Sequence, residues 1–218
     1  MDIKILDSAL REHLLTKAKP KDIAKALSLC SASVEKIEAF NKDFLYHIEI
    51  TTNRIDMASV RGVAREAAAV LPQFGFQAQL NPLKLPSTHH LEGVMARALR
   101  LPATFQVVVS SSFVRRICAV ILEVKQKQTP QYIKDRLEAA GIRSLNNLID
   151  VTNYVMHEIG HPTHAFDYDK LNTKKLTIRE SLKGEKIIML DRKEYTLPGG
   201  DIIAENDKGQ IVDLLGIM

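Results

Sequence analysis

The run Gly141–Asp167 constrains the fold of this chain more than any other segment, because two helix-breaking signals lie near its end. Its apolar centre, Ile149–Val155, is compatible with either a strand or a helix. Gly160 and Pro162 follow, and the residue before a proline is biased away from the α region. We therefore expect any helix through this run to end at or before His161.

The same run contains a sequence that is typical of zinc proteases, His157-Glu158-Ile159-Gly160-His161. That chemistry needs both histidines on one face of a continuous helix, together with a third ligand. Pro162 opposes the continuous helix. Asp167 is the better-spaced third ligand, but His164 occupies the position where the extended zinc-protease pattern has glycine. A zinc metallohydrolase remains an alternative interpretation.

Along the chain, the pattern of apolar residues predicts an α+β protein in two parts. Residues 1–80 are expected to form a small helical module, similar to a helix-turn-helix, in which Asp7 or Ser8 caps the first helix. A strand and a helix capped by Ser59 follow. Residues 88–218 are expected to form a mixed-sheet domain that is incomplete at its C-terminus. Its expected strands are 105–110, 117–124, 176–179, 186–190, 194–197 and 201–204, with Cys118 in the core and a helix beginning at Thr129-Pro130.

Composition is ordinary for a globular protein, with 45% hydrophobic and 26% charged residues among 218. No apolar run approaches the roughly 18–20 residues that a membrane span needs, and the charged N-terminus is unlike a secretory signal. Cys30 and Cys118 lie far apart without a CxxC pattern, which favours a reducing, cytoplasmic setting. The net charge of +4 permits contact with nucleic acid. The helical pair lacks the side chains that read DNA bases.

Several motifs with fixed spacing resemble one family, the beta subunit of bacterial phenylalanyl-tRNA synthetase. They occur in its N-terminal module and in most of its editing domain. The motifs are Thr52-Asn53-Arg54-x-Asp56, Gly62-Val63-Ala64-Arg65-Glu66, most of the run Gly141–Asp167, Lys183-Gly184-Glu185 with Leu190-Asp191, and Gly216-Ile217-Met218. The resemblance spans nearly all of the chain.

Two departures from the family pattern bear on what the chain does. Bacterial members usually carry a tRNA-binding OB-fold before the NRxD strand, whereas only a short stretch separates Lys36 from Tyr46 here. The chain also stops at Met218, before the glycine pair and the downstream glutamate of the editing domain. We therefore expect a fragment or truncated product that does not aminoacylate, and whose editing activity needs testing.

The resemblance implies an editing pocket that hydrolyses mischarged tyrosyl-tRNA(Phe) and supports aminoacylation by a partner subunit. An apolar pocket rejects an isostere with an added hydroxyl by only about 10², so charging phenylalanine leaves tyrosine to be removed. The hydrolysis needs a positioned water and oxyanion donors, and no metal. By resemblance, His164 orients the water or the terminal ribose. Thr152 and Asn153 hold the amino-acid end, and the substrate-binding residues are Pro162, Ala165 and Gly216.

The resemblance also implies the partners and cofactors of the complete enzyme. These are an alpha subunit, in an assembly of two alpha and two beta subunits, together with tRNA(Phe), ATP and magnesium. No cofactor is expected in this chain itself, and neither a membrane nor DNA is expected as a partner. The second hypothesis is a non-catalytic RNA- or protein-binding module with the same fold.

Overall fold

The computed structural model describes residues 1–83 and 105–216. The chain forms two compact units that interleave along the sequence, Met1–Leu85 with Lys125–Ala165, and Pro86–Val124 with Phe166–Met218. The division into domains 1–80 and 88–218 remains our proposal for the domain boundaries. Part of the expected boundary, residues 84–87, lies outside the described residues, as do Ile217 and Met218.

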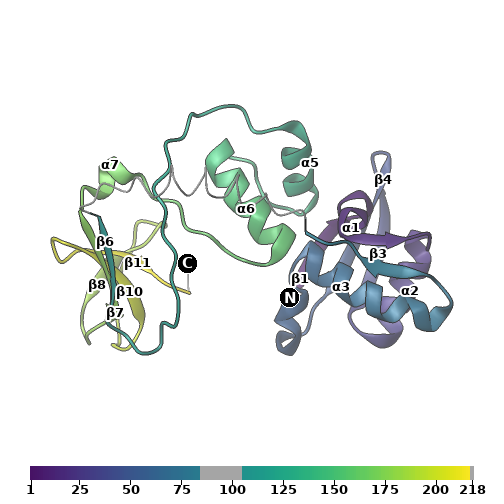
Figure 1. Cartoon of the computed structure of the whole chain (residues 1–218), viewed down its shortest axis with the longest axis horizontal. Helices are drawn as coiled ribbons and strands as arrows, with labels where there is room; N and C mark the ends of the chain where they lie inside the picture. The colour runs from purple at the N-terminus through teal and green to yellow at the C-terminus, as the bar shows by residue number, and fades with distance from the viewer. Residues whose placement is uncertain (84–104, 217–218) are drawn as a thin grey trace. The chain divides into compact units, whose positions relative to one another are not determined.

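The first unit is built on an antiparallel sheet of three strands in the order β1-β4-β3, with a two-stranded ribbon of β2 and β5 (Figure 1). The two expected N-terminal helices are present as α1 and α2, but the strand β1 precedes them and β3 follows directly, so residues 1–37 are not purely helical. The elements are β1 (Asp2–Leu6), α1 (Asp7–His13), β2 (Leu14–Thr16), α2 (Pro20–Cys30), β3 (Ser33–Phe40), β4 (Asp43–Glu49), η1 (Thr52–Met57), α3 (Val60–Val70), η2 (Leu71–Phe74), β5 (Ala78–Leu80), α5 (Gln131–Ala139) and α6 (Asn147–Ile159).

The first helix begins differently from the prediction. Neither Asp7 nor Ser8 caps α1, because Leu6 occupies the N-cap position without a side-chain hydrogen bond. The Asp7 carboxylate instead accepts a hydrogen bond from the buried Tyr46 hydroxyl (2.6 Å) and another from Arg11 (2.6 Å). A tertiary contact to β4 therefore outcompetes the local cap.

One continuous core holds the first unit together. Apolar side chains at helical spacing on α2 and α3 are buried in this core. Ser59 caps α3 as expected, since its hydroxyl accepts a hydrogen bond from the Gly62 amide (2.9 Å). The fully buried members include Ile5, Leu10, Ile23, Leu27, Tyr46, Val63, Ala67 and Leu71.

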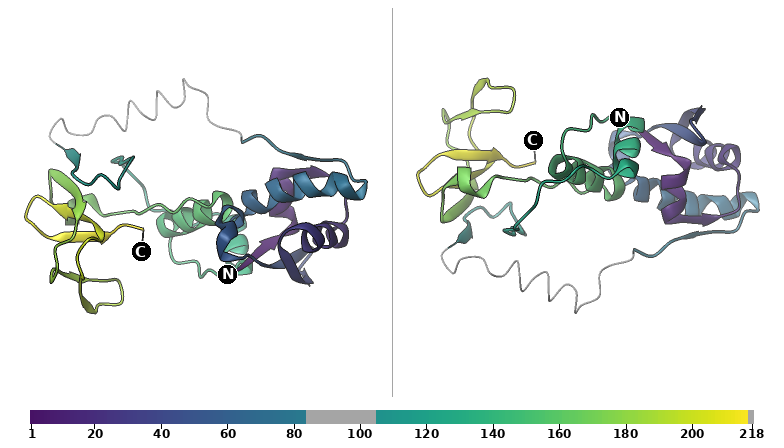
Figure 2. Two further views of the ribbon diagram at one scale, coloured as in Figure 1. Left: turned by 90° about the horizontal axis from the view of Figure 1, so that it is seen from below. Right: turned by 90° about the horizontal axis from the view of Figure 1, so that it is seen from above.

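The second unit is a mixed four-stranded sheet in the order β11-β10-β7-β6, in which β6 pairs parallel to β7 and the other pairs are antiparallel. Figure 2 shows β10 and β11 of this sheet in yellow from two further sides. The elements are β6 (Gln106–Val109), α7 (Tyr168–Leu171), β7 (Lys175–Glu180), β8 (Lys186–Ile188), β9 (Glu194–Thr196), β10 (Ile202–Asn206) and β11 (Ile211–Leu214). The α+β class is confirmed.

The segment Ile117–Val124 differs from the prediction, because it forms no strand. Val120 and Leu122 are exposed, and the expectation that Cys118 lies in the core is wrong, since it too is exposed. A strand requires an adjacent strand edge for its backbone hydrogen bonds, and a β-rich composition alone does not supply one.

Candidate functional site

The ambiguous run in the sequence forms the helix α6, whose two ends are set by local signals. At the start, the Asn146 side chain accepts hydrogen bonds from the amides of Leu148 and Ile149, both at 3.2 Å. At the end, Gly160 adopts the left-handed conformation (φ 78°) that closes many helices. The predicted stop before His161 is confirmed.

Asp150, in the first turn of α6, holds the segments before the helix through buried hydrogen bonds. It is fully buried, and its carboxylate accepts hydrogen bonds from the hydroxyls of Thr129 (2.5 Å) and Ser144 (2.7 Å) and from the Leu145 amide (2.8 Å). Burial opposes the charge, but these three donors outweigh it and hold the pKa of Asp150 below its usual value. Asp150 therefore fixes the α5–α6 connection.

Of the residues predicted to form the site, Thr152 and Asn153 lie side by side on α6, and both are partly buried. The Thr152 hydroxyl donates to the Ile149 carbonyl within the helix (2.8 Å). Such a bond orients the side chain and leaves the oxygen lone pairs available as acceptors.

The other predicted residues follow the helix or lie elsewhere in the chain. Pro162, His164 and Ala165 are exposed in the irregular segment after α6, within the first unit. Gly216 belongs to the second unit and has φ 82°, a backbone conformation that favours glycine. In the same unit, Asp167 caps α7 by accepting a hydrogen bond from the Lys170 amide (3.1 Å).

The zinc-protease sequence does not have the geometry that its chemistry needs. His157 lies on α6, whereas His161 lies beyond the end of the helix. His157 Nε2 donates to the Lys4 carbonyl (3.0 Å), and Glu158 faces His13 Nε2 (3.2 Å). Among the described residues, no three His, Cys, Asp or Glu side chains are grouped so that they could hold a metal.

Sequence reasoning missed a polar cluster that joins α5 and α6 to the N-terminal elements. Arg136 on α5 lies over the rings of Tyr132 and Tyr154, and it donates to Glu12 and to the Tyr154 hydroxyl. His13 is buried beside it, with 7% of its surface exposed. Arg136 and Glu12 are 124 residues apart in the sequence, and Arg136 and Tyr154 lie on different helices. No local sequence pattern therefore indicates these contacts.

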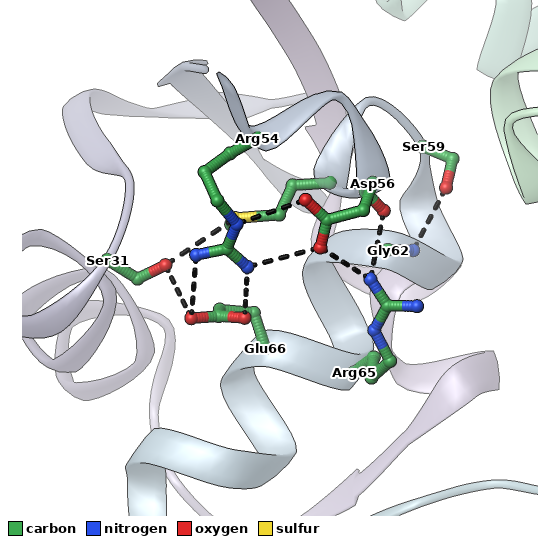
Figure 3. A network of polar contacts seen from close by, with 8 residues as sticks. Ser31, Arg54, Asp56, Ser59, Gly62, Arg65 and Glu66 are labelled. Carbon is green, nitrogen blue, oxygen red and sulfur yellow. Dashed lines mark hydrogen bonds and ion pairs between the residues drawn. The ribbon is translucent and has the colours of Figure 1, made fainter. Parts of the chain in front are cut away.

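The NRxD and GxARE segments form a second polar network, between η1 and α3 (Figure 3). Arg54 donates to Glu66 (2.7 Å) and to Asp56 (3.0 Å), and Arg65 donates to Asp56 (2.6 Å). Ser31 adds a hydrogen bond to Glu66 (2.7 Å). The network pairs two cations with two carboxylates, so these motif residues form structural ion pairs.

Glycine is required at position 62 for this network to form. A Cβ there would lie 2.4 Å from the Asp56 carbonyl oxygen and 2.8 Å from Met57 Cα. Such distances are far below van der Waals contact, so η1 packs directly on the backbone of α3. The two segments thus form both a close backbone contact between η1 and α3 and the ion pairs that join them.

Comparisons with known proteins found related sequences and solved structures. A B3/4 domain family model matches residues 114–218. The phenylalanine–tRNA ligase beta subunit of Syntrophus aciditrophicus is 38% identical over 177 residues, 81% of this chain and 21% of that protein. The beta subunit of Moorella thermoacetica is 32% identical over 222 residues, 100% of this chain and 25% of that protein. Among solved structures, an N-terminal fragment of the phenylalanyl-tRNA synthetase beta subunit from Pyrococcus horikoshii covers 99% of this chain and 61% of its own, with a TM-score of 0.42 and 11% identity.

The family model thus identifies residues 114–218, which include α6 and the segment after it, as B3/4-type sequence. More narrowly, the chain belongs to the phenylalanine–tRNA ligase beta subunit family. It spans about a fifth to a quarter of the length of these relatives, at 21% and 25%. No helix among the residues that the structure describes is long and apolar enough to cross a membrane.

Proposed function

We propose that this chain contributes the editing region of a phenylalanine–tRNA ligase, which hydrolyses tyrosine mischarged onto tRNA(Phe). The observation that carries the proposal is the motif Thr152-Asn153 on a helix anchored by the buried Asp150, followed by the exposed Pro162 and His164 in the same compact unit. A helix that carries acceptor side chains and is followed in the chain by an exposed histidine offers the kinds of group that can position an ester and a water.

The chemical task follows from the substrate. Tyrosine differs from phenylalanine by one hydroxyl, which a second pocket can recognise by hydrogen bonding, whereas phenylalanine would leave those polar groups unpaired. In the proposed mechanism, His164 orients the attacking water or the terminal ribose, and Thr152 and Asn153 hold the amino-acid end. By resemblance, Pro162 and Ala165 are proposed to shape the pocket wall, and a role of Gly216 in substrate binding remains a proposal taken from the family motif.

The remaining parts of the proposal concern the complete enzyme. Its alpha subunit would perform aminoacylation with ATP and magnesium, tRNA(Phe) would be the shared substrate, and the assembly would work in the cytoplasm. The names of the relatives support this, since they are beta subunits of phenylalanine–tRNA ligases. We assign ATP and magnesium to the complete enzyme and not to this chain.

The test is the deacylation of tyrosyl-tRNA(Phe) by the chain alone and by the chain completed with the C-terminal part of the Moorella relative, together with an alpha subunit. We expect the completed protein to deacylate and the His164→Ala variant to let tyrosyl-tRNA accumulate while phenylalanine charging continues. His161→Ala is the matched control, because His161 is also exposed and lies three residues away. Equal deacylation by wild type and His164→Ala would refute the assignment of His164. Absence of deacylation by the completed wild-type protein would favour a non-catalytic binding module.

A further inference from the structure

The connection between β2 and α2 and the first turns of α2 carry lysines that face solvent. The exposed lysines are Lys17, Lys19, Lys21 and Lys25, and none of them forms an ion pair with a residue that the structure describes. Two stretches of the chain meet here, residues 14–34 and residues 67–81. Asp22 is the only acidic residue in either stretch, and its carboxylate accepts a hydrogen bond from the Lys19 amide (3.2 Å). This part of the surface is therefore strongly basic.

The backbone arranges these lysines in a row, which we call the lysine stripe (Lys17, Lys19, Lys21 and Lys25). Ala18 is only 1% exposed, so Lys17 and Lys19 on either side of it point outward, as alternate side chains of an extended segment do. Lys21 and Lys25 are four residues apart on α2 and share its exposed face. Both spacings separate neighbouring lysines by about 6–7 Å along the backbone.

Hydrogen bonds fix the loop that carries the first lysines of the stripe. The Arg11 guanidinium donates to the carbonyls of Thr16 (3.1 Å) and Ala18 (2.8 Å), the two neighbours of Lys17. The Thr16 hydroxyl donates to the Gln77 carbonyl (2.7 Å), which ties the loop to the segment before β5. A binding surface that is ordered beforehand loses less conformational entropy when a partner binds.

An open hollow of about 490 Å³ adjoins the Lys17 end of the stripe. Leu15, which is 48% exposed, and the half-buried Phe76 contribute apolar surface to it, and the exposed Gln77 contributes polar atoms. Lys17 is the one charged residue among those that line the hollow. Its size falls in the range of small-molecule sites, roughly 300–1,000 Å³. A flat ring with hydrogen-bonding edges, such as a nucleotide base, suits a hollow of this composition.

We propose that the lysine stripe and the adjoining hollow bind a single-stranded segment of RNA, with phosphates along the stripe and one base in the hollow. Lysines neutralise phosphates regardless of base sequence, and an apolar surface beside them holds an unpaired base. An acidic peptide would satisfy the lysines and would have no ring for the hollow. The choice of RNA rests on the proposed function, in which tRNA is the substrate. The surface itself shares no residue with the proposed editing pocket.

Fluorescence anisotropy measures this binding with the whole chain and without deacylation, using a labelled single-stranded RNA of about 12 nucleotides at several salt concentrations. We expect Lys17→Gln/Lys19→Gln/Lys21→Gln to bind roughly tenfold more weakly. The slope of log affinity against log salt should shrink by about 2, since each phosphate contact of a single strand contributes about 0.7. Leu15→Ser should weaken binding severalfold and leave the slope unchanged, because it removes apolar surface and no charge.

The matched control removes three exposed lysines that already face carboxylates. These are Lys36, Lys186 and Lys193, which pair with Glu38, Glu194 and Asp191. The triple Lys→Gln control changes the net charge by the same amount, and we expect it to weaken binding by less than about threefold. Equal losses in the two triple variants would show that only overall charge matters, and would overturn the proposal. Wild-type affinity in the stripe variant would overturn it too. Circular dichroism checks that every variant is folded.

Competition experiments test the identity of the partner. Single-stranded RNA should outcompete both polyglutamate of equal charge and a duplex of the same RNA, because paired bases cannot enter the hollow. Equal competition by polyglutamate would identify a surface for acidic proteins, and equal binding of the duplex would exclude the base from the hollow. Either result overturns the proposal. Stripe-dependent RNA binding without deacylation by the completed protein would refute only the editing function, whereas deacylation without stripe-dependent binding would refute only this surface.

Discussion

Glu66 Oε2 on α3 lies 2.7 Å from Arg54 Nη2 on η1, so an ion pair ties the helix to the turn that precedes it. The side chain of Glu66 is 18% exposed, and Arg54 lowers the pKa of this carboxyl. A hydroxyl from Ser31, at the end of α2, completes the contact. One carboxylate thus connects three segments of the first unit.

We expect Glu66→Gln to lower the free energy of unfolding by roughly 1–2 kcal/mol, because the charge-assisted hydrogen bonds become neutral and one acceptor is lost. Urea titration followed by circular dichroism measures the change. Arg65→Gln serves as the comparison, since the Arg65 side chain is 54% exposed and its pair with Asp56 is accessible to water. A loss for Arg65→Gln equal to that for Glu66→Gln would contradict the central role of Glu66.

Gly62→Ala should destabilise the first unit, although alanine is the better helix former by about 1 kcal/mol. The new methyl group would overlap the backbone of Asp56 and Met57, and backbone atoms cannot move aside as the tip of a flexible side chain can. We expect a net loss of at least about 2 kcal/mol by overpacking. Denaturant unfolding checks this, and an increase in stability would show that η1 does not pack on α3 as described.

Asp150→Ala should cost about 3 kcal/mol, since it leaves the donors of Thr129, Ser144 and Leu145 without their buried acceptor. The lowered pKa adds a pH dependence. Because an unfolded aspartate titrates near 3.9, the stabilisation is present above about pH 4 and is lost as the pH falls below that value.

Unfolding free energies measured from pH 6 down to about pH 3 should therefore fall less steeply for Asp150→Ala than for the wild type. Asp135→Ala is the control, because Asp135 is an exposed carboxylate on α5 and its loss should change stability by less than about 0.5 kcal/mol. Parallel pH profiles for Asp150→Ala and the wild type would argue against a charged, hydrogen-bonded Asp150.

The features that the sequence predicted well depend on neighbouring residues. Ser59 caps α3 through an amide three residues away, and Gly160 ends α6 through its own backbone conformation. Short strands such as β7 and β10 are bounded by turn residues. In each case the physical cause lies within one helical turn or one strand.

The features that it missed depend on distant partners. Ile117–Val124 has strand-forming side chains, yet a strand also needs a free edge, which the local pattern cannot show. His13 and Glu158, whose side chains face each other at 3.2 Å, are separated by 145 residues, and neither residue belongs to a recognisable motif with the other. The predicted site residues came from family motifs, and the polar cluster around Arg136 came only from the fold.

Zinc binding provides the last test, because the chain carries the zinc-protease sequence without its geometry. The left-handed Gly160 ends α6 before His161, and the neutral His157 ring donates its Nε2 hydrogen to Lys4. A second ligand on the same helical face is therefore missing, and metal binding through Nε2 would require breaking the contact to β1. We expect less than one equivalent of zinc by elemental analysis of protein purified with zinc present, and no change in tyrosyl-tRNA deacylation after chelation. A full equivalent of zinc that disappears in His161→Ala would show that the two histidines act together and would revive the hydrolase alternative.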